Sequence, residues 1–369
     1  MSHLVSPPHL RPARCQLPVG WYFDPEIFAL EKQRLFDAGP CYVGHELMVP
    51  QVGDYHTLAW MDHARMLVRN PDGVELLSNV CRHRQSIMLE GRGHLENIVC
   101  PLHRWTYDLE GELLGAPQFA ESPCLKLHST PLANWNGLLF AGPREARMDL
   151  AGMIRGTDFD FSGYRLDRVQ VEDYACNWKT FIEVYLEVYH VDPFHPGLGN
   201  FTDCNNFHVE YGEHYSVQVV SAKKGLAAPG TPVYTKWQQA CLEQLDGAAP
   251  KYGALWATYL PGLMLEWYPN VLVVSHLIPR SPELTTNVVE FYYPEEMVLF
   301  ERGFIEAQQA AYAETAQEDD EICRRMDRGR KALWRQGLDD AGPYQSPMED
   351  TMVHFHEWLR ARLDRTIAR

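Results

Sequence analysis

The apolar and polar positions along the chain first indicate a short helix near its start. Asp24 is suited to cap a helix that has Pro25 at its first position, and the apolar positions that follow are Ile27, Leu30 and Phe36. The residues before this helix are rich in Pro and His and show no such periodicity. Residues 1–40 are therefore expected to form an arm and a helix that pack on the C-terminal domain.

From about residue 41 to residue 142 the pattern changes to short β-forming runs separated by Gly, Pro and Asp turns. The clearest of these runs are residues 65–69, 74–78 and 137–140. Short strands between frequent turns are typical of a small antiparallel domain. We place this all-β domain at residues 41–145.

Beyond residue 145 strand-like and helical segments are mixed. The strand-like segments are 215–220, 271–275 and 287–293. Ser346-Pro347-Met348-Glu349 predicts the start of the last helix, because it is a capping box with Pro at the first helical position. The apolar stripe of that helix comprises Met348, Met352, Phe355, Leu359 and Leu363. Residues 146–369 are expected to form an α+β domain with one antiparallel sheet and long helices.

The composition limits the classes of function. The chain has 369 residues, of which 46% are hydrophobic and 22% charged, an ordinary globular composition. A formal net charge of −16 without a basic cluster argues against a nucleic-acid partner. There is no apolar stretch of about 20 residues to span a membrane and no N-terminal signal pattern. The nine cysteines, most of them without metal-ligand spacing, suggest a cytoplasmic protein with reduced thiols.

Two short Cys-His pairs give the most specific chemical signal. Sixteen residues separate Cys81-Arg-His83 from Cys100-Pro-Leu-His103. Two thiolates and two imidazoles can bind zinc, or a [2Fe–2S] cluster in which two histidines replace two cysteines on one iron. Zinc sites more often group the ligands as C-x-x-C and H-x-x-x-H. The order C-x-H…C-x-x-H is the Rieske pattern, so the spacing favours the cluster over zinc.

A pair of histidines forms a second candidate metal site. Residues 178–190 suit a helix, on which Glu187 and His190, three residues apart, share a face. Pro193 disfavours helical geometry at the residue before it, so the chain is expected to turn and bring His195 back beside His190. Two neutral imidazoles and one carboxylate make the facial triad of non-haem Fe(II). The alternative is a purely structural pair of histidines.

The carboxylate is predicted on a late helix, within the acidic run 318–321. The apolar residues on the helical face of Asp319 are Ile322, Cys323, Met326 and Leu333. A buried aspartate needs a partner, and a metal ion is a suitable one. Asp320 is offset by about 100° toward Arg324 and looks like a surface acid, as the whole run would on a solvated face. Asp319 is therefore preferred to Asp320.

Together these motifs resemble the α subunit of Rieske non-haem iron oxygenases, the family of ring-hydroxylating and carnitine/choline-type oxygenases. The similarity covers nearly the whole chain, including N-W-K at 177–179 and E-D-x-x-I-C at 318–323. It implies an all-β Rieske [2Fe–2S] domain followed by a helix-grip-type catalytic domain. The implied cluster ligands are Cys81, His83, Cys100 and His103, and the implied ligands of a mononuclear Fe(II) are His190, His195 and Asp319.

The resemblance also implies an assembly. In this family a head-to-tail homotrimer brings the cluster of one subunit beside the iron of the next, and an acid bridges the two centres. Here that acid is Glu187, expected to hydrogen-bond His190 and the partner subunit's His103. Most ring dioxygenases carry Asp at this place, whereas Glu is typical of carnitine- and choline-type monooxygenases. Val184 replaces the Asn common in the family, which makes the pocket more apolar if that position faces the iron.

The implied activity is that of a terminal oxygenase that uses O₂ and electrons from outside. No G-x-G-x-x-G fingerprint follows a predicted strand, so NAD(P)H would deliver electrons through a separate flavin or iron–sulfur reductase. The expected reaction is monooxygenation, as hydroxylation or as oxidative demethylation or cleavage, of a small organic substrate, with Glu187 as the catalytic residue. The alternative is a cis-dihydroxylating dioxygenase of an aromatic ring. A zinc protein or an electron carrier without oxygenase activity is a less favoured alternative.

Aromatic residues of the C-terminal domain suggest a class of substrate. They are Trp256, Tyr259, Trp267, Tyr268, Tyr292 and Tyr293. With Glu266 they can form a cage for a quaternary ammonium group, although core packing is the ordinary role of such residues. Asn205, Phe207 and His208 are further pocket candidates by their position alone.

Overall fold

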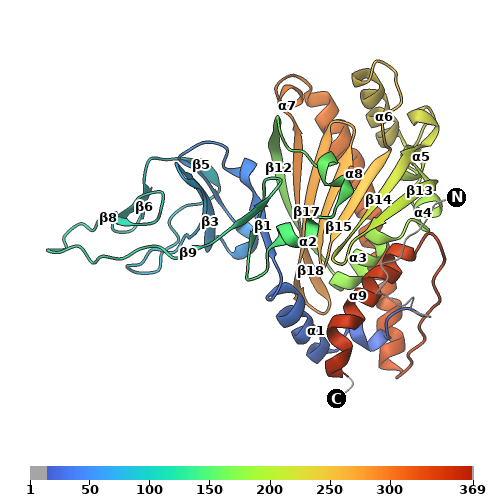
Figure 1. Cartoon of the computed structure of the whole chain (residues 1–369), viewed down its shortest axis with the longest axis horizontal. Coiled ribbons are helices and arrows are strands. Elements are labelled where there is room, and N and C mark those ends of the chain that lie inside the picture. Colours follow the sequence, from blue (N-terminus) through green and yellow to red (C-terminus); the bar gives the residue numbers. More distant parts are fainter. Residues whose placement is uncertain (1–14, 368–369) are drawn as a thin grey trace. The chain divides into compact units, whose positions relative to one another are not determined.

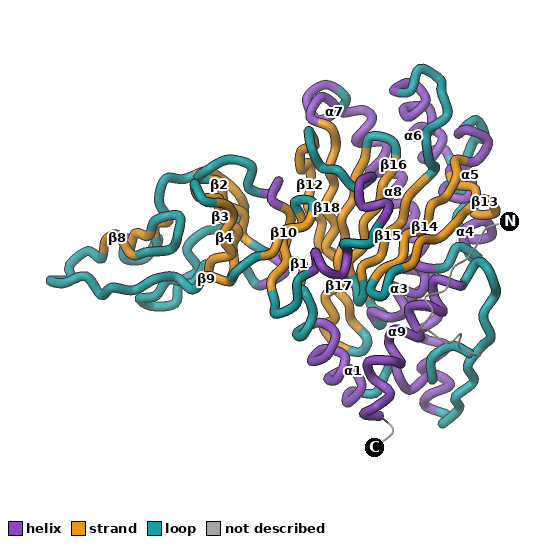
Figure 2. Tube along the Cα trace, viewed as in Figure 1, coloured by secondary structure: helices purple, strands orange, loops and turns teal. Residues whose placement is uncertain are grey.

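The computed structural model describes residues 15–367 (Figure 1). This part of the chain divides into two compact units, one of residues 37–148 and one of residues 15–36 with 149–367. The smaller unit is built of strands and the larger one of a sheet with helices (Figure 2). The predicted α+β class is therefore confirmed. No helix among the described residues is both long and apolar enough to cross a membrane.

The smaller unit contains three antiparallel sheets. The first has the order β1 (Cys41–His45), β11 (Leu138–Ala141), β10 (Ala133–Trp135). The second has the order β5 (Arg92–His94), β2 (Asp54–Thr57), β3 (Arg65–Asn70), β4 (Gly73–Ser78), β9 (Ser129–Thr130). The third has the order β6 (Ile98–Val99), β7 (Thr106–Tyr107), β8 (Leu113–Gly115). One core cluster joins Cys81 and Cys100 to apolar residues of β3, β4 and β7, so both thiols lie in the interior.

The larger unit is organised around a seven-stranded antiparallel sheet. In spatial order its strands are β12 (Tyr164–Tyr174), β18 (Leu284–Pro294), β17 (Val271–Ser281), β16 (Leu263–Tyr268), β15 (Ala254–Tyr259), β14 (Tyr215–Ala222) and β13 (Thr202–Tyr211). Trp256 on β15 pairs with Glu266 on β16, which pairs with Val273 on β17. Directly paired residues point to the same face of a sheet, so Glu266 lies in the middle of one face.

Helices cover this sheet. The longer ones are α3 (Trp178–Leu186), α6 (Pro232–Gln244), α8 (Arg302–Arg335) and α9 (Asp350–Ile367), and the shorter ones are α1 (Pro25–Glu31), α2 (Ala146–Leu150), α4 (Val191–Phe194), α5 (Leu198–Phe201) and α7 (Glu295–Phe300). One core cluster joins α6 and α8 to the sheet face that carries Trp256, Tyr268 and Val273. A second joins α1, α3 and α9 to Met264 and Leu277. The predicted first helix is confirmed, with Asp24 accepting a hydrogen bond from the Glu26 N–H at 2.8 Å.

Two predicted helix boundaries are wrong. The helix expected over 178–190 ends at Leu186, because Glu187 adopts an extended conformation (φ −102°, ψ 135°). The last helix begins at Asp350 and not at Pro347. The Ser346 hydroxyl donates to Asp350 Oδ2 at 3.2 Å, and the Glu349 carboxylate accepts from the Gln345 N–H. Both side chains of the expected capping box are thus used in a turn that precedes the helix.

Candidate metal centres

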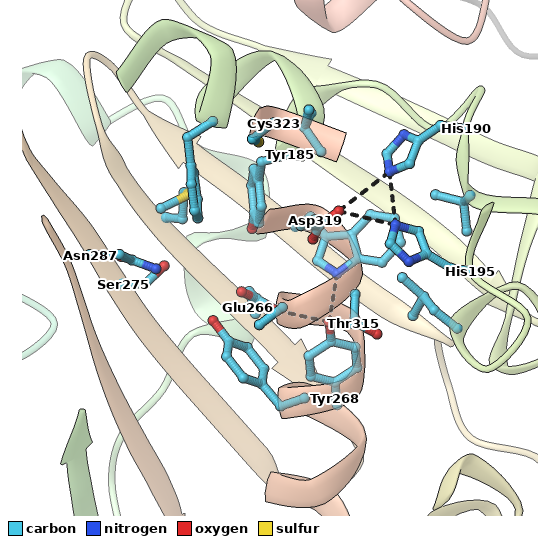
Figure 3. A pocket seen from close by; sticks show the side chains of 18 of the residues that line it. Tyr185, His190, His195, Glu266, Tyr268, Ser275, Asn287, Thr315, Asp319 and Cys323 are labelled. Carbon is cyan, nitrogen blue, oxygen red and sulfur yellow. Dashed lines mark hydrogen bonds and ion pairs between the residues drawn. The ribbon is translucent and has the colours of Figure 1, made fainter. Parts of the chain in front are cut away.

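His190, His195 and Asp319 come together in the larger unit (Figure 3). The two histidine Nε2 atoms are 3.0 Å apart, and Asp319 Oδ1 lies 3.1 Å from Nε2 of His195 and 3.7 Å from Nε2 of His190. Two nitrogens that bind one metal ion at about 2.1 Å and at a right angle lie roughly 3.0 Å apart. Two imidazoles and one carboxylate on one side of a metal ion match the facial triad of non-haem Fe(II). The residues present therefore fit a mononuclear iron.

The local fold explains how the two histidines meet. The chain leaves α3 at Glu187, five residues earlier than expected at Asp192, so Glu187 and His190 do not share a helical face. The single turn of α4 then carries the chain from His190 to His195, and the His195 N–H donates to the Val191 carbonyl at 2.9 Å. This short helix accommodates Pro193, whose missing N–H is not needed in a first turn.

Two acids hold the far ring nitrogens of the histidines. Glu187 Oε1 lies 2.5 Å from Nδ1 of His190, and its Oε2 accepts from the His190 backbone N–H at 3.0 Å. Glu318 Oε2 lies 2.7 Å from Nδ1 of His195. A carboxylate at Nδ1 fixes the proton there and leaves Nε2 as the metal-binding atom. Glu318 was missed in the sequence, where it reads as one acid of a solvated run; its only signal is its place beside Asp319.

The charges of the site are strongly coupled. Burial would raise the pKa of Asp319, but hydrogen bonds and positive charge from His190 and His195 lower it to about 2. Burial would likewise lower the pKa of His190, but its contacts with Asp319 and Glu187 raise it to about 10. The pKa of His195 is also raised, by Asp319 and Glu318 against the effect of burial. The Asp319 carboxylate and the two rings therefore stabilise each other's charged forms.

The three residues open onto a pocket between the sheet and the helices. Its aromatic lining consists of Tyr174, Phe181, Tyr185, Tyr234, Trp237, Trp256, Tyr268 and Tyr312. Its acidic lining comprises Glu187, Glu266 and Asp319. Val184 also lines the pocket, so the apolar replacement at this position does face the site.

Only some of the aromatic residues named from the sequence reach this pocket. Trp256 and Tyr268 line it, whereas the buried side chains of Tyr259, Tyr292 and Tyr293 and the half-buried side chain of Trp267 belong to other parts of the sheet. Tyr259 donates to Asp149, for example, and Trp267 packs against Tyr252. Asn205, Phe207 and His208 lie on β13 and do not contribute to the lining.

The two Cys-His pairs lie on matched loops in the smaller unit. The Cys81 N–H donates to the Ser86 carbonyl at 2.9 Å, and the Gln85 N–H returns to the Cys81 carbonyl at 3.1 Å. The second loop repeats both bonds, with Cys100 N–H to the Trp105 carbonyl at 2.8 Å and Arg104 N–H to the Cys100 carbonyl at 3.1 Å. Gln85 and Arg104 both have positive φ, 54° and 60°. The two loops that carry the candidate cluster ligands therefore share one backbone geometry.

Thiols and imidazoles are arranged on different sides of this site. Cys81 and Cys100 are both buried in one core cluster, and Tyr107 Oη is 3.5 Å from Cys81 Sγ. The rings of His83 and His103 have centroids 4.6 Å apart, and the His103 side chain is exposed. Two inner thiolates and two outer imidazoles suit a [2Fe–2S] cluster whose histidine-bound iron is nearer the surface. The residues therefore fit the cluster.

Comparison with known families agrees with both centres. Residues 40–131 match the Rieske [2Fe–2S] domain, and residues 161–365 match the ring hydroxylating α subunit (catalytic domain). The chain belongs to the Rieske-type ring-hydroxylating oxygenase α subunits. Its two domains therefore imply a Rieske cluster and a mononuclear iron, and the zinc alternative is not supported.

Individual relatives narrow the branch of the family. The chain is 63% identical to a putrescine 2-hydroxylase of Ralstonia nicotianae over 99% of its own length and 100% of the relative. It is 54% identical to a putrescine 2-hydroxylase of Bordetella bronchiseptica, covering 97% and 87%. The crystal structure of the quaternary ammonium Rieske monooxygenase CntA with L-carnitine shares the fold, with a TM-score of 0.73, 19% identity and coverage of 95% and 96%. Monooxygenation is thus favoured over the dihydroxylating alternative.

Proposed function

We propose that this terminal oxygenase hydroxylates putrescine, or an aliphatic diamine of similar length, at C2. The observation that carries the proposal is the 63% identity to a putrescine 2-hydroxylase over essentially the full length of both chains. In the balanced reaction one atom of O₂ enters a C–H bond and the other leaves as water. NAD(P)H supplies the two electrons through a reductase, and two protons come from the solvent.

The test is turnover of the purified protein with a matching reductase, NADH, putrescine and isotopically labelled O₂. We expect hydroxyputrescine that carries one labelled oxygen, with the hydroxyl group at C2 by mass spectrometry and NMR. Two labelled oxygens would indicate dihydroxylation, and a product without label, or no product, would contradict the proposal. The Asp319→Ala variant, which leaves both cluster loops unchanged, is the inactive control.

We further propose the roles of the site residues. Cys81, His83, Cys100 and His103 hold the cluster, and the mononuclear iron is held by His190, His195 and Asp319. The distances within the His-His-Asp group and the matched loops of the Cys-His pairs support these roles. When bound, the cluster supplies single electrons and the iron activates O₂. The protein itself keeps the protons on Nδ1 of the two histidines through Glu187 and Glu318.

Glu187 has a second proposed role, as the bridge to the partner subunit's His103 in a homotrimer. Its contact with His190 Nδ1 at 2.5 Å supports the half of the bridge that lies within one chain. The Glu187→Gln variant is expected to retain both metal centres, by iron and sulfide analysis, while turnover slows by roughly 10- to 100-fold. Full turnover in this variant would contradict the proposed bridging role of Glu187. The homotrimer is tested separately, by light scattering of the wild-type protein.

The remaining proposals concern organisation and electron supply. We propose a Rieske domain at 41–145 and a catalytic domain at 146–369 with residues 1–40 attached to it; the division into units at 37–148 supports these bounds. Members of this family receive electrons from a separate reductase. We propose that this chain is cytoplasmic and receives its electrons from a separate flavin or iron–sulfur reductase.

A further inference from the structure

We propose that Glu266 binds a terminal primary ammonium group of the substrate, and that this contact decides which carbon faces His190, His195 and Asp319. The inference rests on the proposed function, because it deepens the recognition of a diamine. Glu266 projects from β16 into the pocket (Figure 3). In this view Glu266 and Tyr268 lie on the sheet side of Asp319, while His190 and His195 lie on its other side.

The carboxylate of Glu266 is incompletely satisfied by the protein. Its Oε2 accepts from the Tyr268 hydroxyl at 2.8 Å, and that hydroxyl accepts from Trp256 Nε1 at 2.9 Å. Among the described residues, no donor reaches Oε1 and no Lys, Arg or His forms an ion pair with Glu266. The side chain is only 5% exposed. Buried carboxylates normally have a charged partner, so a cationic ligand is the missing one.

The surroundings of Glu266 suit an ammonium group that donates hydrogen bonds. The Tyr185 hydroxyl lines the same pocket and is buried without a hydrogen-bond partner. Burial raises the pKa of Tyr185, and the nearby charge of Glu266 raises it further. The Trp237 ring adds an aromatic face to the wall, which stabilises a cation. One unpaired carboxylate oxygen, one unpaired hydroxyl and aromatic walls therefore line the same pocket.

These acceptors distinguish between two kinds of cation. A primary ammonium group has three N–H donors and can satisfy both Glu266 Oε1 and Tyr185 Oη. A trimethylammonium group has no donor and would leave both oxygens buried without a hydrogen bond, at a cost in affinity. The quaternary ammonium cage considered from the sequence is therefore the less suitable occupant.

The pKa of Glu266 is consistent with this role. Burial raises it to about 7, against the hydrogen bond from Tyr268 and with a further contribution from the charge of Asp319. An ammonium ion at Oε1 would stabilise the ionised form and offset the effect of burial.

The first experiment measures binding and not turnover. Putrescine is titrated calorimetrically into the anaerobic holoenzyme, as wild type and as Glu266→Gln, after cluster and iron contents are matched. We expect the dissociation constant to rise about 100-fold in Glu266→Gln, because one partner of a buried charge pair is lost. The control Glu296→Gln removes an exposed acid on α7 and should bind putrescine within about twofold of the wild type. Equal affinity of Glu266→Gln and wild type would overturn the inference.

A second variant tests the positioning. Glu266→Asp keeps the charge but moves it back by about one methylene. The affinity for 1,5-diaminopentane relative to that for putrescine should therefore be roughly fourfold higher in this variant than in the wild type. An unchanged ratio would contradict the idea that Glu266 sets the position of the chain. This variant also retains the buried charge if Glu266→Gln fails to fold.

Monoamines separate this inference from the proposed function. In one outcome the wild type binds butylamine but neither binds nor hydroxylates putrescine, while Glu266→Gln no longer binds butylamine. That result would support the ammonium site and contradict putrescine as the substrate. If the wild type hydroxylates putrescine and Glu266→Gln binds it equally well, the function stands and the site fails. Tighter binding of butyltrimethylammonium than of butylamine to the wild type would overturn the preference for a primary ammonium.

Discussion

Two buried glutamates of the larger unit differ in how completely the protein satisfies them. Glu183, on α3, accepts from the Tyr22 hydroxyl, lies 2.9 Å from Nε2 of His356 and pairs with Arg330 Nη2 at 2.6 Å. Glu266, on β16, accepts from the Tyr268 hydroxyl alone. Both are at most 5% exposed. Burial is thus nearly equal, and the number of partners is what differs.

The difference shows in the proton affinity of the two acids. Burial would raise the pKa of Glu183, but the charge of Arg330 and the contacts with His356 and Tyr22 lower it to about 2. For Glu266 burial outweighs its hydrogen bond, and the pKa rises to about 7. A buried acid surrounded by protein donors holds segments together, here the N-terminal segment, α3, α8 and α9. A buried acid without them is available to a ligand.

The largest effect is expected when the satisfied acid is neutralised. Glu183→Gln removes the closer charge partner of the mostly buried Arg330 and leaves only the 3.8 Å contact with Asp327, which should lower the free energy of unfolding by about 3 kcal/mol. The measurement is urea unfolding of the holoenzyme at pH 7, followed by tryptophan fluorescence. Glu266→Gln is the matched control, since it is the same replacement in the same unit and should cause no loss. Equal losses in the two variants would erase the distinction between the acids.

The dependence of stability on pH should have opposite signs for the two acids. Glu183, whose pKa falls from 4.5 to about 2 on folding, stabilises the protein above pH 4.5 and loses this contribution as the pH falls toward 2. Glu266, whose pKa rises from 4.5 to about 7, keeps its proton in the folded state while the unfolded chain ionises. Its contribution is complete below pH 4.5 and is lost as the pH rises to about 7.

Between pH 4.5 and about 7 the ionisation of Glu266 in the unfolded chain should lower the unfolding free energy of the wild type by about 3 kcal/mol. The difference in unfolding free energy between wild type and Glu266→Gln, measured from pH 4.5 to 8, should therefore shift by that amount in favour of the variant. Asp319, with a pKa of about 2, stays ionised throughout this window. A difference that does not change with pH would show that Glu266 has a cationic partner in the folded protein.

A third acid lies between these two cases, because its partner is itself a proposed metal ligand. Glu318→Gln keeps an acceptor at Nδ1 of His195 but removes the charge, so affinity for the mononuclear iron should fall about tenfold, or roughly 1.4 kcal/mol. Iron retention against increasing chelator measures this. Glu321→Gln, which removes an exposed acid of the same run paired with Arg325, should retain iron like the wild type. Equal retention in both variants would deny Glu318 a positioning role.

The sequence predicted which proposed ligand residues lie together better than it predicted the local structure that positions them. Spacing alone identified the Cys-His pairs, because each pair is local and its loop is short. The pairing of His190 with His195 was also correct, but the expected route was wrong, since the helix ends at Leu186 and Glu187 reaches His190 from an extended conformation. A helical pattern does not show where tertiary contacts end a helix.

Long-range contacts were the least predictable. Glu318 is 123 positions from His195 in sequence, and nothing local distinguishes it from the acids beside it. Of the aromatic residues considered for the pocket, Trp256 and Tyr268 line it. The strand pattern alone could not select them, because strands such as β15 and β18 are buried on both faces. The incomplete satisfaction of Glu266 is likewise visible only in the folded protein.

The smallest expected effect concerns the one donor that Glu266 has. Tyr268→Phe removes the hydroxyl between Trp256 and Glu266, which should cost about 1 kcal/mol of stability. Because that hydrogen bond lowers the pKa of Glu266, the carboxyl should also be more protonated at pH 7, and putrescine should bind roughly threefold more weakly. Tyr259→Phe is the control, since it removes a buried hydroxyl that donates to Asp149, and neither residue lines the pocket. It should lower stability similarly without changing diamine affinity, so an equal loss of affinity in both variants would trace the effect to general loosening of the sheet and not to Glu266.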